Sequence, residues 1–250
     1  MIQYAVINLS WEKEDKFTFL PILFSLFLFE IFWFASKSGK LKSLFYKNKE
    51  FDNASATHIT FFRIFGFIIM GFVSAALCLI FMPDYSLADY GFTYNADTTL
   101  FTVLWTSGLA VIGIPLAFIS ARKPKNHDNY PQIRAKFWTK KIIFMNAFGW
   151  AVYLLGYEFL FRGVLLFPLA EHLGVWTAVA VNIALCSATH IPKGLDETLG
   201  AIILAVILSL LTLASGTIWI AFFVHLTLAL TNSFTALKFH PDMYYLKNEK

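Results

Sequence analysis

Long stretches of apolar residues, almost free of charge, recur along this chain and constrain its fold more than any other feature. A helix needs about 20 mostly apolar residues to cross roughly 30 Å of hydrocarbon. Seven stretches satisfy this condition: 17–36, 60–82, 99–121, 142–168, 173–191, 198–214 and 217–237. A helix pairs all its backbone groups internally in lipid, which a lone strand cannot do. The sequence therefore predicts an all-α, polytopic integral membrane bundle of about seven transmembrane helices.

The composition excludes several other classes of protein. Hydrophobic residues make up 58% of the 250 residues and charged residues only 14%, which is too few to cover a water-soluble globule. The aromatic share of 18% excludes a disordered chain. The net charge of +4 is spread between the apolar stretches rather than along one face, so nucleic-acid binding is not expected.

Basic residues alternate between the connecting segments and predict the orientation of the chain. The segment 37–59 is rich in lysine, 83–98 has three aspartates and no basic residue, and 122–141 is again strongly basic. Because basic loops stay on the cytoplasmic side, we expect the N-terminus outside and 37–59, 122–141 and the C-terminal tail in the cytoplasm.

Two regions are expected within this bundle. Residues 1–141 would form an N-terminal transmembrane region with three spans and basic cytoplasmic loops. Residues 142–250 would form a core of four spans that carries the site, followed by a short cytoplasmic tail. The stretch 142–168 is too long for one vertical crossing, so we expect it to be tilted or bent, with Gly149 and Gly156 available for a bend.

Ionisable side chains inside the spans require an explanation, because each costs about 3 kcal/mol on insertion scales. In the first three spans, Glu30 and Arg63 are expected to pair with each other or to reach the interface. The last four spans hold a larger set of polar residues: Glu158, Arg162, His190, His225 and Asn232. Glu158 and Arg162 are four residues apart and therefore share one helix face, where they can form an ion pair. A shared polar cavity between these helices is the simplest interpretation.

The residue types in this cavity permit three kinds of chemistry. A carboxylate with two imidazoles and an amide can activate water and stabilise an oxyanion. Two histidines and a glutamate can also bind zinc with one open position, or relay protons in a transporter. No H-E-x-x-H helix is present, and none of the seven stretches contains an aspartate, so zinc proteases of that type and paired-aspartate proteases are excluded.

Three short motifs in residues 145–235 resemble those of the CPBP family, intramembrane proteases that include the Rce1-like CAAX prenyl proteases and bacterial Abi proteins. The family motif E-E-x-x-x-R followed by glycine corresponds to the segment from Tyr157 to Gly163. The motif F-x-x-x-H corresponds to Cys186 through His190. The motif H-x-x-x-N matches at His225 but has Ala229 at the amide position.

The resemblance implies a glutamate-type protease that needs no metal. A motif glutamate and His190 would activate water, His225 would stabilise the oxyanion, and Arg162 would hold the glutamate. Tyr157 stands where the first glutamate of the pair belongs, so Glu158 would have to take over as the base. Asn232 lies one turn beyond Ala229 and could supply the missing amide, whereas Cys186 is expected to affect packing only.

These observations predict an intramembrane endopeptidase that cleaves a peptide or a membrane-anchored protein. The alternative is a catalytically impaired relative that acts as a membrane scaffold or an immunity-type protein. No cofactor is expected, although zinc bound by Glu158, His190 and His225 stays open as an alternative. The expected partners are the substrate and the lipid bilayer. A composition rich in lysine and phenylalanine is typical of AT-rich bacterial genomes, so the expected location is a bacterial cytoplasmic membrane.

Overall fold

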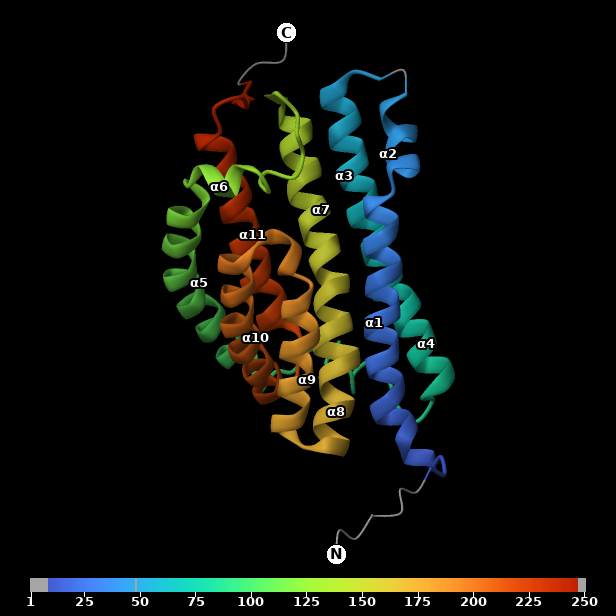
Figure 1. The fold of residues 1–250 in the computed structure, drawn as a ribbon. Coiled ribbons are helices and arrows are strands. Elements are labelled where there is room, and N and C mark those ends of the chain that lie inside the picture. The colour runs from blue at the N-terminus through green and yellow to red at the C-terminus, as the bar shows by residue number, and fades with distance from the viewer. Residues whose placement is uncertain (1–8, 48, 247–250) are drawn as a thin grey trace, which may run out of the picture.

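A computed structural model of the chain describes residues 9–47 and 49–246, and it consists almost entirely of helices (Figure 1). Here α marks α-helices, β marks strands, and η marks 3-10 or π helices. The elements are η1 (Lys13–Asp15), α1 (Lys16–Lys37), α2 (Gly39–Tyr46), α3 (Phe51–Phe67), η2 (Ile68–Val73), α4 (Ser74–Phe81), α5 (Thr99–Ala121), α6 (Pro124–His127), β1 (Phe137–Trp138), α7 (Lys140–Glu158), η3 (Phe159–Leu165), α8 (Leu166–Leu173), α9 (Val175–Ala188), η4 (Ile191–Lys193), α10 (Leu195–Ser215), α11 (Trp219–Phe239) and β2 (Tyr244–Tyr245). The predicted all-α membrane fold is confirmed.

Six helical segments in the described part of the chain are long and apolar enough to cross a membrane. They are Lys13–Lys37, Phe51–Phe81, Thr99–Ala121, Lys140–Leu173, Leu195–Ser215 and Trp219–Phe239. The stretch 173–191 differs from the expected span, because α9 has only 14 residues. At 1.5 Å per residue α9 is about 21 Å long, which is shorter than the roughly 30 Å of hydrocarbon.

Helices α9 and α10 form a hairpin whose connecting turn lies deep in the bundle. In Figure 1 this turn is well below the level at which α3 and α7 begin. The loop between α6 and β1 reaches down to it: the Lys193 Nζ donates to the Tyr130 hydroxyl at 2.9 Å, and that hydroxyl donates to Glu197 at 2.9 Å. The short helix α9 therefore ends part-way along the bundle, in a turn whose Ile191 and Leu195 side chains are exposed.

The segment from α7 through η3 to α8 is one helical run of 34 residues. At 1.5 Å per residue it measures about 51 Å, which is longer than the hydrocarbon layer. This length agrees with the prediction that the stretch is too long for one vertical crossing. Its middle, η3, is π-helical, and so is η2 on the neighbouring helix. π-Helical turns are rare and often lie at functional sites.

Gly149 and Gly156, which the sequence offers as bend points, permit close helix packing. A Cβ atom at Gly156 would lie 2.9 Å from the Phe67 Cα atom, and one at Gly149 would lie 2.9 Å from the Arg63 Cδ atom. Only glycine lets α7 approach α3 and η2 this closely.

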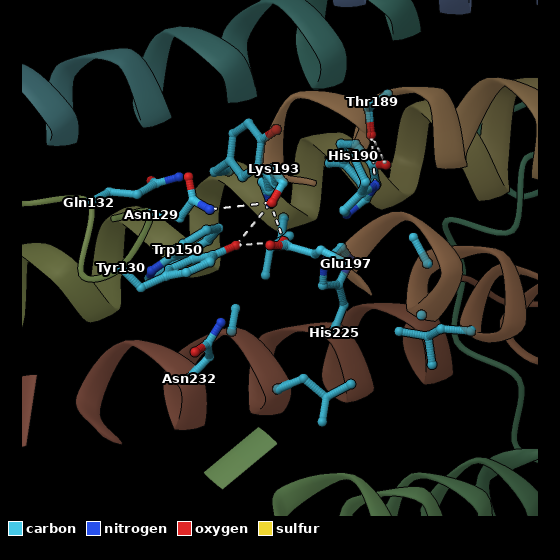
Figure 2. Close-up of a pocket in the computed structure, with 18 of the residues that line it drawn as sticks. Asn129, Tyr130, Gln132, Trp150, Thr189, His190, Lys193, Glu197, His225 and Asn232 are labelled. Atoms are coloured by element: carbon cyan, nitrogen blue, oxygen red, sulfur yellow. Dashed lines mark hydrogen bonds and ion pairs between the residues drawn. The ribbon is translucent and has the colours of Figure 1, made fainter. Parts of the chain in front are cut away.

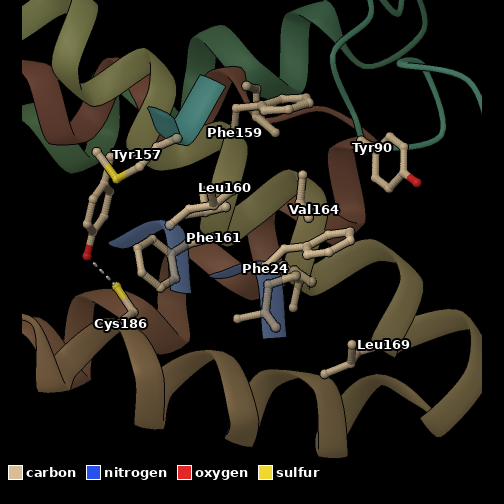
Figure 3. Packing of buried hydrophobic residues seen from close by; sticks show 14 of the residues in the cluster. Phe24, Tyr90, Tyr157, Phe159, Leu160, Phe161, Val164, Leu169 and Cys186 are labelled. Atoms are coloured by element: carbon tan, nitrogen blue, oxygen red, sulfur yellow. Dashed lines mark hydrogen bonds between the residues drawn. The ribbon is translucent and has the colours of Figure 1, made fainter. Parts of the chain in front are cut away.

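The main hydrophobic core surrounds η3 and α8 (Figure 3). Phe161 and Val164 of η3 are buried against Phe24 of α1, and Leu169 extends the core along α8. Helix α5, by contrast, packs mainly on α11 and has no buried residue in its most apolar window. The helical run from α7 to α8, which carries the first motif, is therefore the most buried of the six long helical segments.

The ends of the helices agree with the alternation of basic loops. Lys16, at the start of α1, forms an ion pair with Asp84 of the acidic loop at 2.8 Å. Helix α2, the loop after α5 and the end of α11 all lie at the opposite end of the bundle (Figure 1). The two basic loops therefore share one end of the molecule. That this end faces the cytoplasm stays a prediction.

Cysteine labelling tests the orientation. Lys42→Cys and Lys123→Cys place a thiol in each basic loop and Asp89→Cys places one in the acidic loop, all at exposed positions. The native Cys78 and Cys186 are buried and provide a low background. A membrane-impermeant maleimide added to intact cells should label only Asp89→Cys. Labelling of the two basic loops from outside would reverse the predicted orientation.

Gly156→Ala tests the helix contact. Because the added methyl group would meet the backbone of Phe67, we expect a loss of about 1–3 kcal/mol in the free energy of unfolding, as for other overpacked sites. The matched control is Gly108→Ala on α5, whose Cβ would have no neighbour within 4 Å. The measurement is thermal unfolding in detergent. Equal stability of Gly156→Ala and Gly108→Ala would contradict the close contact between Gly156 and Phe67.

Candidate functional site

Glu158 and Arg162 form a buried ion pair at the start of η3. The Arg162 Nη1 atom lies 3.2 Å from the Glu158 Oε2 atom, and the two side chains are 2% and 0% exposed. Both residues are carried by the same helix, as their spacing of four predicts. Each charge compensates the other where water cannot, so the carboxylate can remain ionised inside the membrane.

His225 of α11 binds the same carboxylate from the opposite side. Its Nδ1 atom lies 2.5 Å from the Glu158 Oε1 atom. Because an ionised carboxylate only accepts hydrogen bonds, the histidine Nδ1 must donate, and in the neutral ring the Nε2 atom then keeps a lone pair. A carboxylate that fixes an imidazole in this way also stabilises the imidazolium that forms when Nε2 takes up a proton.

His190 follows the last turn of α9 and is also fixed through its Nδ1 atom. This atom lies 3.2 Å from the Cys186 carbonyl oxygen and 3.0 Å from the Thr189 hydroxyl. The carbonyl can only accept, so Nδ1 again donates. The neighbouring Ser187 hydroxyl donates to the Ile183 carbonyl at 2.6 Å and is therefore engaged with its own helix.

Tyr157 and Cys186, two positions at which this sequence departs from the family motifs, contact each other. The Tyr157 hydroxyl lies 3.1 Å from the Cys186 Sγ atom and 3.1 Å from the Thr189 hydroxyl. Arg162 Nη1 donates to the same sulfur at 3.2 Å. Cys186 was expected to affect packing only. Its sulfur instead links the first motif to the second, and the small side chain leaves room for the tyrosine ring.

A cavity of about 880 Å³ adjoins these residues. Figure 2 shows His190 and His225 on opposite sides of the cavity. Gln132 and Asn129, from the loop between α6 and β1, lie at its other end. Tyr157 is part of the cavity wall, whereas Glu158 lies behind it and is fully buried. Any effect of the carboxylate on a molecule in the cavity must therefore pass through His225.

Asn232 lines the cavity but is not gathered with the two histidines. It lies seven residues beyond His225, about 10 Å along the helix axis. Its side-chain oxygen accepts a hydrogen bond from Asn126 Nδ2 at 3.0 Å. Of the sequence-predicted residues, the structure brings together Glu158, Arg162 and His225, places His190 across the cavity, and leaves Asn232 apart.

A known protein family shares the part of the chain that carries this site. Residues 138–231 match the family model for type II CAAX prenyl endopeptidase Rce1-like proteins. This part of the chain is an Rce1-like domain. The match confirms the CPBP resemblance over these residues and supports, at family level, a CAAX-protease-like membrane endopeptidase. No curated protein and no solved structure matches the chain.

A further polar cluster, not predicted from the sequence, joins the Rce1-like domain to the loop that precedes it. Lys193 Nζ donates to Glu197 at 2.9 Å as well as to Tyr130, and all three residues line the cavity (Figure 2). Burial raises the pKa of the Tyr130 hydroxyl, so the hydroxyl stays protonated and can donate to Glu197. The spacing of four between Lys193 and Glu197 could have indicated the ion pair, but Tyr130 is 63 residues away from Lys193.

The residues named for a possible zinc site do not all gather in the structure. Across the described residues there is no group of three or more His, Cys, Asp or Glu side chains that could hold a metal ion. Glu158 and His225 contact each other, whereas His190 stands across the cavity from them (Figure 2).

Arg162→Met tests the dependence of the site on its ion pair. Removing the guanidinium would leave Glu158 charged, buried and uncompensated, so the free energy of unfolding should fall by about 3–5 kcal/mol. The double variant Glu158→Gln, Arg162→Met removes both charges and should recover part of that loss. Unfolding in detergent decides the question. A double variant no more stable than Arg162→Met would show that the ion pair is not the reason for the loss.

Proposed function

We propose that this protein is a membrane-embedded endopeptidase that cleaves a peptide or a membrane-anchored protein in the cytoplasmic membrane of a bacterium. The Glu158–His225 pair carries the proposal, because it presents an imidazole with a free Nε2 atom at the wall of a cavity. The Rce1-like domain supports the reaction class. The cavity extends to the loop end of the bundle, where a polypeptide could enter.

In the proposed mechanism, His225 acts as the general base. Its Nε2 takes a proton from a water molecule while the water oxygen attacks the peptide carbonyl carbon. Glu158 stabilises the resulting imidazolium, and Arg162 keeps Glu158 ionised. His190 orients the water by accepting its second hydrogen through Nε2. When the tetrahedral intermediate collapses, the proton on His225 passes to the leaving nitrogen, so the chain is cleaved with one water consumed.

A second candidate function is peptide binding without cleavage. It is favoured by Tyr157, which occupies the position of the first motif glutamate and directs its hydroxyl to Cys186 and Thr189. Ala229 likewise offers no amide beside His225. Such a protein would use the same cavity to hold a segment of a partner, as expected for a scaffold or an immunity-type protein.

The two candidates are distinguished by the protein termini found in membranes and medium. We would compare cells that lack the protein with cells carrying the wild type, Glu158→Gln or His225→Gln. For the endopeptidase we expect new termini with the wild type and a loss of at least about 100-fold in both variants, as is usual when a general base or its support is removed. Glu30→Gln, at an exposed position on α1 outside the cavity, is the matched control and should behave as wild type.

Equal abundance of all proteins must be verified by immunoblot. If wild type and both variants gave the same termini as cells without the protein, the endopeptidase would be contradicted and the binding function favoured. If Glu158→Gln alone retained full activity, cleavage would stand but the role of the carboxylate would not.

A further inference from the structure

Arg63 of α3 is a buried cation with no acidic partner in the described chain. Its side chain is 3% exposed. Nη1 donates to the Asn146 carbonyl oxygen at 2.9 Å and to its side-chain oxygen at 3.1 Å, and Nη2 donates to Gln132 at 3.1 Å. All these acceptors are neutral, and the Nε atom has no hydrogen-bond partner. The expected pairing with Glu30 is wrong: the five ion pairs among the described residues do not include Arg63, and Glu30 is exposed.

The surroundings of Arg63 hold the guanidinium in one place. Its guanidinium carbon lies 4.1 Å from the ring centre of Trp150, and Gly149 leaves room for its aliphatic part on α7. Asn146 is itself fixed, because its side-chain nitrogen donates to Ser233 at 3.1 Å. A positioned guanidinium with unused donors matches the geometry of a carboxylate, which it can bind through two parallel hydrogen bonds.

The cavity that Arg63 lines carries an excess of positive charge. Its charged lining residues are Lys37, Arg63, Arg134, Lys193, Asp128 and Glu197. Lys193 is neutralised by Glu197, and the Asp128 carboxylate offsets part of the charge of Arg134, which leaves Lys37 and Arg63 without an acidic partner in the cavity lining. The uncompensated charge therefore lies at the end of the cavity away from the two histidines, where Gln132 is also found (Figure 2).

The remaining walls are apolar. They are formed by side chains such as Phe29 and Trp33 of α1, Leu109 and Leu116 of α5, and Leu204 of α10. Along α7, Trp150 beside Arg63 and Tyr157 beside His225 are seven residues apart, or about 10 Å. One apolar peptide segment of a few residues can therefore reach from the histidines to the guanidinium.

We propose that Arg63, oriented by Asn146, Gln132 and Trp150, binds a carboxylate of an apolar peptide held in this cavity. The inference rests on the proposed function only in that the ligand is a peptide, and cleavage is not required. The carboxylate can belong to a chain terminus or to an acidic side chain. A lipid phosphate fits less well, because Arg63 is twelve residues along α3 from Phe51, about 18 Å from the end at which headgroups would lie.

The test measures binding of four probes to the purified full-length protein in neutral-lipid nanodiscs. The first is an N-acetylated tetrapeptide of leucine and phenylalanine with a free C-terminal carboxylate, and the second is its C-terminal amide. The third is the amide with one internal glutamate, and the fourth is octyl phosphate. Wild type should bind the first or the third probe at least tenfold more tightly than the second, and more tightly than octyl phosphate.

Three variants locate the effect. Arg63→Gln should remove the preference for a carboxylate while leaving the affinity for the amide unchanged. Arg63→Lys should reduce the carboxylate preference, since an ammonium cannot donate the two parallel hydrogen bonds of a guanidinium. Arg122→Gln is the matched control, because Arg122 stacks on Phe118 and Phe239 outside the cavity. If Arg63→Gln does not fold, Arg63→Lys and the wild-type ratio still decide.

The preference for the first probe over the third, or the reverse, identifies the source of the carboxylate, and either supports the proposal. The proposal would be overturned if all peptides bound with equal affinity or if none of them bound. It would also be overturned if Arg63→Lys kept the full carboxylate preference of the wild type. Tighter binding of octyl phosphate would replace it by a lipid site. Wild-type binding that persists in His225→Gln without cleavage would support the carboxylate site even if the endopeptidase proposal failed.

Discussion

The carboxylate of Glu158, held between Arg162 and His225 in the interior of the bundle, is the interaction on which the rest of the site depends. An isolated charge at this depth would be strongly unfavourable, and the guanidinium at 3.2 Å makes it tolerable. Once ionised, the carboxylate fixes the orientation and the protonated nitrogen of His225. The same Arg162 contacts the sulfur of Cys186 and so ties α9, with His190 just beyond its end, to η3. The Glu158–Arg162 pair thus connects η3 with α9 and α11 around the cavity.

The helical geometry places this interaction. The π-helical segment η3 begins directly after Glu158, so the tyrosine, the glutamate and the arginine of the motif lie at the junction of two helix types. Gly156 allows α3 and η2 to pack against this junction at backbone distance. The short hairpin of α9 and α10 then brings His190 into the interior, where it faces His225. Each of these features departs from a regular 20-residue membrane helix.

The sequence predicted the class of fold and the ion pair of Glu158 with Arg162, because both depend on local patterns. Runs of apolar residues located the helices, and the spacing of four between Glu158 and Arg162 correctly indicated the ion pair. Contacts between distant segments were not predictable. The partners of Arg63 come from α7 and from the loop at Gln132, and nothing in the α3 sequence indicates them. The contact of Tyr157 with Cys186 joins residues 29 positions apart. The length of α9 was overestimated because the uncharged stretch 173–191 extends past both ends of the helix, through Gly174 and Thr189.

The central claim is that the buried carboxylate sets the tautomer of His225 and leaves its Nε2 atom free at the cavity wall. Nitrogen-15 NMR of histidine-labelled protein in nanodiscs tests this directly, with His225→Gln used to assign the resonance. We predict a neutral His225 ring with the proton on Nδ1 and an unprotonated Nε2 in the wild type, and a loss of this form in Glu158→Gln. A wild-type His225 with its proton on Nε2, or one unchanged in Glu158→Gln, would contradict the account.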